Sequence, residues 1–171
     1  DDAHFNQPDG LVATSTGVLS VADTANATIR RIGADGHVTT LAGSTTARGH
    51  NDGVAAQATF SAPLGLALDG SGNLYVADAT NHTIRKITAA GVVSTLAGSA
   101  GLTGFTNGVG AAARFNYPAG VAVDAAGNVF VADRTNHSIR RITPAGSVTT
   151  FAGVAGVSGA DDGTGGEALF N

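Results

Sequence analysis

The chain contains 171 residues, with 25 Gly, no Cys, no Met and a formal net charge of -4. This charge excludes electrostatic attraction to nucleic-acid phosphates or anionic lipids, and no apolar run approaches the roughly 18 to 20 residues that span a bilayer. The lack of Cys excludes disulfides, thiolate metal sites and thiol nucleophiles. We therefore expect no nucleic-acid partner, no membrane partner and no cysteine chemistry.

A repeat of 55 residues, without insertions or deletions, organises the whole chain. We divide the chain accordingly into units at 1–59, 60–114 and 115–171, the last of which includes the start of a further repeat. The positions that recur in register are Phe5, Phe60, Phe115 and Phe170; Pro8, Pro63 and Pro118; Gly10, Gly65 and Gly120; Asp23, Asp78 and Asp133; Asn26, Asn81 and Asn136; Ile29, Ile84 and Ile139; and Arg30, Arg85 and Arg140.

Each repeat predicts four short strands, which the second copy illustrates in chain order. Segments 64–69, 73–78, 83–88 and 92–98 are rich in Val, Leu, Ile or Thr, and turn-forming breaks separate them. The stretch 99–115 then crosses to the next repeat. It is predicted to contain a short helical turn before Phe115, with Asp52 and Asp162 in the equivalent capping places. Four consecutive antiparallel strands form one propeller blade.

The inner strands indicate a sheet that is covered on both faces. Residues 120–124 and 129–133 are almost continuously apolar, as expected where a blade is sandwiched between two neighbours. Phe60 and Phe115 follow the crossovers and are predicted to lie buried between blades. The fold class is therefore all-β: a β-propeller array of three four-stranded antiparallel blades, with no α-helix longer than about two turns.

The repeat resembles the NHL repeat. Residues 115–153 fit the motif of that repeat at nearly every position. The motif consists of F-x-x-P-x-G, a strand ending in Asp, Gly-Asn, V-x-V-A-D, T-N-H-x-I-R-x-I and G-x-V-x-T-x-A-G. The resemblance implies a six-bladed propeller that is used mostly to bind proteins, peptides or other polymers. The first copy departs from the motif at Thr14, Val18 and Ala27, where later copies have Asp, Asn and His, so a looser first turn is expected there.

The recurring Asp, Asn and Arg residues are interpreted as structural repeat positions. Asp78 ends one strand and Arg85 lies in the next, so a hairpin brings them together; the alternative is a ring of such pairs around a channel mouth. Because a catalytic centre usually needs residues found in one blade only, we favour a scaffold role, with Asn81 bonding its own backbone in the turn. The positions are Asp23, Asp78, Asp133, Asn26, Asn81, Asn136, Arg30, Arg85 and Arg140.

The histidines and acidic turns match no recognisable metal or catalytic site. His82 and His137 occupy matching turns, and an amidating lyase that shares this fold holds a metal with His, but Ala27 interrupts the series. The turns at 69–73 and 124–128 lack the alternate carboxylates of a calcium loop, and no G-x-S-x-G or phosphate-binding loop is present. We assign no catalytic residue, metal or cofactor. A propeller-class lyase or hydrolase with a metal in the channel is the alternative.

Three N-x-[ST] glycosylation acceptors begin at matching positions, Asn26, Asn81 and Asn136. In a glycosylating compartment each blade could carry a sugar on the same rim. The alternative is that Asn and the hydroxyl residue simply build the turn. We expect an extracytoplasmic or secreted location.

The predicted function is that of a non-enzymatic scaffold or binding module whose loops face a protein, peptide or polymer ligand. The candidate contacts are residues unique to one blade, namely Arg48, His50, Phe105 and Arg134. A propeller typically needs four to eight blades to close, so three leave two apolar faces open. We expect a homo-oligomer, either a dimer that completes a six-bladed ring or an open polymer such as an extracellular filament, or else a piece of a longer chain.

The two ends of the chain carry the same element of the repeat. Residues 166–171 correspond to residues 1–6, since both segments have Ala in third place and end in Phe-Asn. In a ring of two chains, Phe5 and Phe170 would compete for one pocket between blades. Closure is expected to rest on apolar packing of the faces alone, which makes assembly concentration-dependent.

Overall fold

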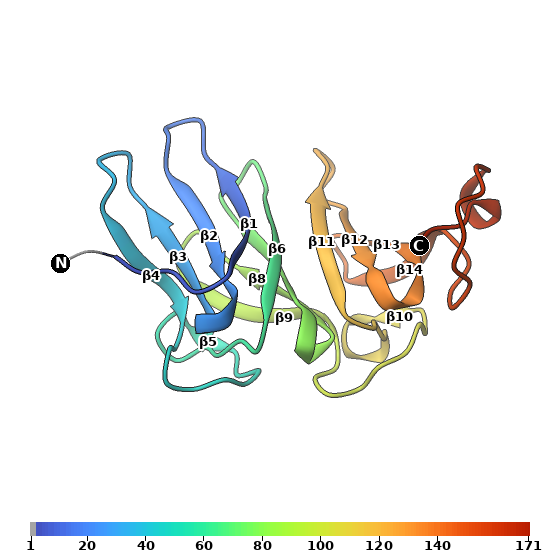
Figure 1. Cartoon of the computed structure of the whole chain (residues 1–171), viewed down its shortest axis with the longest axis horizontal. Coiled ribbons are helices and arrows are strands. Elements are labelled where there is room, and N and C mark those ends of the chain that lie inside the picture. The colour runs from blue at the N-terminus through green and yellow to red at the C-terminus, as the bar shows by residue number, and fades with distance from the viewer. Residues whose placement is uncertain (1–2) are drawn as a thin grey trace.

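Three antiparallel sheets follow one another along the chain, one for each repeat (Figure 1). The computed structural model describes residues 3–171. The first blade has the order β1-β2-β3-β4, the second β6-β7-β8-β9 with β5 added to the outer strand β9, and the third β11-β12-β13-β14 with β10 added to β14. The strands are β1 (Pro8–Ala13), β2 (Leu19–Asp23), β3 (Thr28–Ile32), β4 (Val38–Gly43), β5 (Gly53–Val54), β6 (Pro63–Leu68), β7 (Leu74–Asp78), β8 (Thr83–Ile87), β9 (Val92–Gly98), β10 (Gly108–Val109), β11 (Pro118–Val123), β12 (Val129–Asp133), β13 (Ser138–Ile142) and β14 (Ser147–Ala152).

The helical content is limited to single 3-10 turns. Within residues 3–171 these are η1 (Thr24–Asn26), η2 (Ala79–Asn81), η3 (Gly110–Ala112), η4 (Arg134–Asn136) and η5 (Gly165–Glu167). The expected absence of a long α-helix is therefore confirmed for this part of the chain, as is the short turn before Phe115. No helix in the same part is both long and apolar enough to cross a membrane.

The capping role expected for Asp52 and Asp162 is wrong. η5 follows Thr164 and η3 follows Val109, and neither residue makes a side-chain capping bond. The carboxylate of Asp52 instead accepts a hydrogen bond from Arg85 of the second blade at 2.7 Å. The physical reason is that a buried guanidinium in the neighbouring sheet is a stronger donor than the backbone of a single helical turn.

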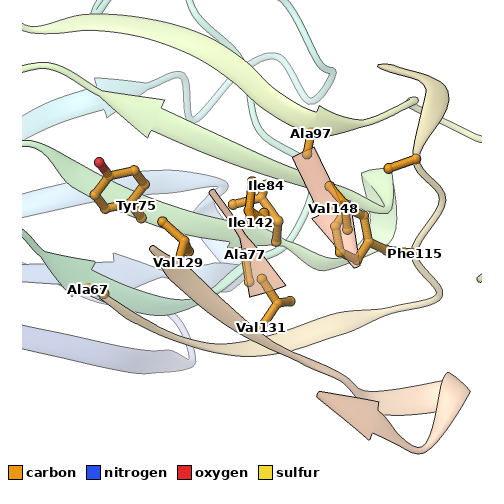
Figure 2. Close-up of a cluster of buried hydrophobic side chains, with 11 residues drawn as sticks. Ala67, Tyr75, Ala77, Ile84, Ala97, Phe115, Val129, Val131, Ile142 and Val148 are labelled. Atoms are coloured by element: carbon orange, nitrogen blue, oxygen red, sulfur yellow. The ribbon is translucent and has the colours of Figure 1, made fainter. Parts of the chain in front are cut away.

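The hydrophobic core lies between blades rather than within any one of them. One cluster joins the first and second blades around Phe60, and the other joins the second and third around Phe115. Figure 2 shows the second cluster, with Tyr75 beside Val129 at one end and Phe115 beside Val148 at the other. Both Phe60 and Phe115 are 0% exposed, which confirms their predicted burial between blades.

Glycines allow the innermost strands of adjacent blades to approach backbone to backbone. A Cβ on Gly10 would lie 3.0 Å from the Cα of Gly65, and a Cβ on Gly65 would lie 2.9 Å from the Cα of Gly120. Such distances are too short for a side chain, so the recurring glycine is a packing requirement of the inter-blade contact. In the part of the chain that the structure describes, a Cβ on Gly120 would meet only the Cβ of Ala132, in its own blade, at 3.5 Å.

Candidate functional site

The recurring Asp, Asn and Arg residues form one buried polar cluster in each blade, which we call the turn cluster. In the second blade, Asp78 ends β7 and lies 3.4 Å from Arg85, in β8, with both side chains fully buried. Asp78 also accepts hydrogen bonds from the backbone N–H groups of Ser61 and Ala62 and from Asn81. Burial raises the pKa of Asp78, while these donors act in the opposite direction.

Arg85 connects the turn cluster to the preceding crossover. Its guanidinium donates to the carbonyl oxygens of Thr59 and Asn51 and to the carboxylate of Asp52, at 2.8 to 2.9 Å for the carbonyls and 2.7 Å for the carboxylate. It also lies 5.1 Å from the ring centroid of Phe60. The cluster therefore ties the incoming chain to the blade that receives it, which is a structural function.

Asn81 does not bond its own backbone as expected. Its amide donates to Asp78 at 2.6 Å and to the carbonyl of Gly49, in the preceding crossover, at 2.7 Å. Asn136 makes the equivalent bonds to Asp133 and to Gly104. Both side chains are buried, and their amide groups donate the hydrogen bonds that build these turns.

The third blade repeats this arrangement with small differences. Arg140 lies 3.0 Å from Asp133, and it donates to the side-chain oxygen of Asn107 at 2.8 Å, where the second blade uses Asp52. Its guanidinium is 5.3 Å from the ring centroid of Phe115. Burial raises the pKa of Asp133, against hydrogen bonds from Asn116, Asn136 and Arg140.

The first blade contains only part of the turn cluster. Arg30 lies 3.3 Å from Asp23, and its side chain is 15% exposed, whereas the side chains of Arg85 and Arg140 are fully buried. Arg30 donates through Nη1 to His4 and lies 5.3 Å from the ring centroid of Phe5. Among residues 3–171, no acceptor is present for its Nη2, which in the other blades is bonded by the crossover.

Polar contacts as well as apolar packing therefore join adjacent blades within the chain. Each internal interface combines a hydrophobic core with the ion pair or hydrogen bond from the crossover to the next blade's arginine. These polar contacts are not predictable from the hydrophobic pattern, because the paired residues Asp52 and Arg85 lie 33 positions apart.

The matching histidines play different roles in the second and third blades. His82 accepts, through Nδ1, a hydrogen bond at 3.0 Å from the backbone N–H of Tyr117, in the next blade. Burial lowers the pKa of His82, while the charges of Asp133 and Asp78 oppose this effect. The Nδ1 of His137 is buried without a partner in residues 3–171. In the same part of the chain, no group of three or more His, Cys, Asp or Glu side chains could hold a metal ion.

The four candidate loop residues lie on the edge of the blades that carries the crossovers, which we call the crossover edge. Phe105 is 60% exposed, and His50 is also exposed. Arg134 lies 5.9 Å above the ring of Tyr117. Arg48 is a structural connector, since it donates to the carbonyl oxygens of Ser61 and Ala25.

A cleft of about 490 Å³ opens between the second and third blades, on the edge opposite the crossovers. Its side chains include Asp69, Tyr75, Lys86 and Asp124. The hydroxyl of Tyr75 donates to Asp69 at 3.1 Å, and the ammonium of Lys86 lies 5.6 Å from the ring centroid of Tyr75. The sequence analysis missed this cleft. A signal exists at the repeat position of Tyr75, because this position varies between copies: it is Ser20 in the first repeat and Phe130 in the third.

The carboxylates of this cleft serve their own turns. Asp69 accepts hydrogen bonds from the backbone N–H groups of Ser71 and Asn73, and from the side chains of Asn73 and Tyr75. Burial acts to raise the pKa of Asp69, but these donors lower it below its usual value. In the first blade, Thr14 stands at the position of Asp69, and its hydroxyl oxygen accepts a hydrogen bond from the backbone N–H of Val18. The carboxylate of Asp69 is accordingly engaged by hydrogen bonds of its own turn.

Tyr75 is expected to remain protonated far into the alkaline range. Burial, and then its hydrogen bond to Asp69, raise the pKa of Tyr75 from 10.0 to about 12. A raised pKa means that its contribution to stability is complete below pH 10.0 and is lost as the pH rises through about 12. The ultraviolet difference between the wild type and Tyr75→Phe should therefore show a phenolate transition near pH 12. A transition near the ordinary tyrosine pKa would contradict the described hydrogen bond.

The two outer faces of the array are copies of faces that are paired inside it. The first-blade face carries Leu11, which is exposed, and Val21, which occupies the repeat position of Val76 and Val131 in the two cores. The third-blade face carries Phe130 and Phe151, whose rings lie edge to face at 5.0 Å. Two pockets of about 250 Å³ each hollow this face, lined by Ile139 and Ala132 among others.

Comparisons with known proteins agree with this architecture. The model of the NHL repeat matches residues 115–142, and that of the teneurin NHL domain matches residues 45–110. NHL repeat-containing protein 2 of Homo sapiens is 35% identical over 151 residues, which cover 81% of this chain and 21% of that protein. Protein SUPPRESSOR OF QUENCHING 1, chloroplastic, of Arabidopsis thaliana is 41% identical over 95 residues, 55% of this chain and 9% of that protein.

Solved structures show the same fold. The crystal structure of an auxiliary nutrient binding protein from Bacteroides thetaiotaomicron superposes with a TM-score of 0.72 at 23% identity, over 94% of this chain and 40% of that one. Among the curated relatives, the chain spans about a fifth of the length of NHL repeat-containing protein 2. Repeat, blade topology and these similarities together assign the chain to the NHL-repeat β-propeller family.

Proposed function

We propose that the chain is a non-enzymatic scaffold or binding module that self-associates through its two open blade faces and presents its crossover edge to a protein, peptide or polymer ligand. The observation that carries the proposal is the row of inner-strand glycines. Gly10 and Gly65 each meet the backbone of the next blade, whereas Gly120 meets none among the described residues. A glycine that is required for close packing at two positions supports a third contact of the same kind at Gly120.

The first-blade face has the complementary surface. By the repeat, Gly120 of one copy would lie against Gly10 of another, as Gly65 lies against Gly120 within the chain. His137 supports the same alignment of the two copies. Its Nδ1 has no donor within residues 3–171, whereas the equivalent Nδ1 of His82 accepts a hydrogen bond from the backbone N–H of Tyr117 in the next blade. The residue equivalent to Tyr117 in the first repeat is Gln7, and both have a left-handed backbone, with φ of 56° and 50°.

Apolar surface supplies the driving force for this association. Phe130 and Phe151 of the third blade would cover Leu11 and Val21 of a second copy, as the internal interfaces do in their own cores. Two copies joined in this way at both faces complete a ring of six blades, in which the contacts close and no face stays open. Exposed Phe105 and His50 then lie on the crossover edge, as surface available to a ligand.

The decisive variant is Gly120→Val, measured by light scattering or sedimentation at several concentrations. In the single chain, a Cβ at this position makes an ordinary 3.5 Å contact with Ala132, so the fold is expected to persist. In the assembly, the new side chain would collide with the inner strand of the second copy. We therefore expect a folded monomer where the wild type is a dimer.

A second variant, Leu11→Asp, places a charge on the exposed part of the same face and is also expected to dissociate the dimer. Its matched control is Val92→Asp, because Val92 is exposed and lies outside both hydrophobic clusters. A wild-type chain that stays monomeric and folded at high concentration, or a Gly120→Val chain that associates like the wild type, would refute the proposal.

A further inference from the structure

We infer that the cleft between the second and third blades binds a neutral sugar, whose hydroxyl groups are held by Lys86 on one wall and Asp124 on the other. Both walls belong to blades that lie next to each other within the chain. The site lies on the edge opposite the crossover edge, so it is separate from the surface of the proposed function. It requires no second copy of the chain.

The two walls of the cleft come from elements that the blades hold rigidly. On the second blade, Tyr75 of β7 and Lys86 of β8 are directly paired across the two strands. On the third blade, the wall consists of the turn 124–127 and of Thr143 and Pro144 at the next turn. Figure 2 shows Tyr75 beside Val129 at one end of the buried cluster, with its hydroxyl directed away from the other side chains. The volume of about 490 Å³ lies within the usual range of small-molecule sites.

Lys86 supplies donors that the protein does not use. Its ammonium lies 5.6 Å from the ring centroid of Tyr75, which is a distance for a cation-π contact. Among residues 3–171 it forms no ion pair, although the carboxylates of Asp69 and Asp124 line the same cleft. An ammonium carries three N–H donors, so Lys86 is positioned by the ring and remains able to donate to a ligand.

Asp124 supplies the free acceptor. It accepts hydrogen bonds from the backbone N–H and from the side-chain amide of Asn128, each at 2.8 Å. The side-chain bond, together with the backbone bonds of the turn, lowers the pKa of Asp124 below its usual value, so the group is ionised at neutral pH. A carboxylate has about four acceptor sites, and these two bonds leave some of them for a ligand. Asp69 differs, because it already accepts four hydrogen bonds, one of them from Tyr75.

The remaining lining favours a neutral ligand with hydroxyl groups and an apolar side. Leu96, Val129 and Pro144 give the cleft apolar surface beside its charged groups. An anion bound at Lys86 would share the cleft with two carboxylates, and a cation bound at Asp124 would share it with an ammonium. A sugar ring avoids both repulsions, since its hydroxyls donate to Asp124 and accept from Lys86 while its C–H groups pack on the apolar surface.

The equivalent cleft between the first and second blades shows that the repeat does not require this set of side chains. Thr14, Ser20 and Arg31 stand there at the positions of Asp69, Tyr75 and Lys86. That cleft has a volume of about 210 Å³, and no carboxylate is present among its lining residues in the described part of the chain. The polar set is therefore particular to one pair of blades, as expected for a binding site and not for a repeated scaffold element.

The test uses the intrinsic fluorescence of Tyr75. The chain has two tyrosines and no Trp, and Tyr117 lies beside Arg134 on the crossover edge. The variant Tyr117→Phe therefore leaves Tyr75 as the one fluorophore with a tyrosine or tryptophan ring. Titration of this chain with the methyl glycosides of glucose, galactose, mannose and N-acetylglucosamine should give a saturable change with at least one of them. Calorimetry on the wild type should give the same dissociation constant.

Three variants then assign the binding to the cleft. Lys86→Gln and Asp124→Asn should each weaken binding of that glycoside by about tenfold or more, because each removes a charged hydrogen-bonding group. Arg31→Gln is the matched control in the equivalent cleft and should bind like the wild type. Gly120→Val, which disrupts the proposed dimer, should also bind like the wild type. Circular dichroism and the denaturant midpoint check that each variant is folded.

Three results would overturn the sugar site. The first is the lack of a saturable response to every glycoside up to its solubility limit. The second is equal weakening by Lys86→Gln and Arg31→Gln, which would place the binding outside this cleft. The third is binding of inorganic phosphate or of free lysine in the cleft in place of the glycosides, with an affinity that falls as salt is added, which would assign a charged ligand. None of these results bears on the oligomeric state, so the proposed self-association stands or fails on its own variants.

Discussion

Replacing Phe115 with Ala is expected to lower the free energy of unfolding by about 3 to 5 kcal/mol, as is typical for a fully buried aromatic side chain. Phe115 is 0% exposed and packs in the core that joins the second and third blades. Its ring lies against the backbone of Gly98, where a Cβ would come within 3.2 Å of the Cδ2 atom. Truncation therefore removes contacts with both blades at once, and the rigid sheets cannot collapse into the space.

The measurement is the denaturant midpoint at a fixed protein concentration, because association also contributes to apparent stability. Phe60→Ala should show a loss of similar size, since Phe60 has the same burial and the same place in the repeat. The matched control is Phe105→Ala, which removes a ring that is 60% exposed and should change stability by no more than about 0.5 kcal/mol. Midpoints of Phe60→Ala and Phe115→Ala equal to that of the wild type would show that the blades are not joined through these rings.

Replacing Arg85 with Met is expected to destabilise the chain by about 3 to 5 kcal/mol, because it leaves a buried charge without its partner. Arg85 and Asp78 are both fully buried, and Arg85 also bonds two carbonyl oxygens and Asp52 of the crossover. Methionine retains much of the volume of the side chain but none of these donors. The loss therefore falls on both the turn cluster and the connection between the first and second blades.

The informative comparison is with Arg30→Met, measured in the same way. Arg30 has the same hairpin and the same aspartate partner, but it is partly exposed and lacks the crossover acceptors within residues 3–171. Arg30→Met should therefore lower the free energy of unfolding clearly less than Arg85→Met does. Equal losses at the two sites would mean that the crossover bonds contribute nothing to stability.

The strand pattern and the pairing of near neighbours were predictable because they are local. The predicted segment 83–88 is β8 (Thr83–Ile87), and 92–98 is β9 (Val92–Gly98). Asp78 and Arg85 are brought together by the hairpin between β7 and β8, where the register is fixed by a short turn. An exact repeat also makes each observation available three times, which separates a structural residue from an incidental one.

The bonds that cross from one blade to the next were not predictable in this way. Nothing in the local pattern indicates that Asp52 pairs with Arg85 rather than capping a turn, or that Asn81 bonds Gly49. The cleft beside Tyr75 likewise needs the turns of two blades to meet. Such contacts depend on the angle and distance between sheets, which are set by packing and not by the periodicity of any one strand.

The sequence by itself determined the family, the number of blades, the strands and the buried position of Phe60 and Phe115, because the repeat spacing and the short apolar segments can be read directly along the chain. The tertiary structure alone decided which polar groups are satisfied and which are left over. Within residues 3–171, Gly120 has no opposing backbone, the Nδ1 of His137 has no donor and Arg30 has no crossover acceptor, which is recognised only by comparison with the equivalent residues of the other blades. A hydrogen bond requires two groups at about 3 Å in the right direction, and that coincidence exists only once the sheets are stacked.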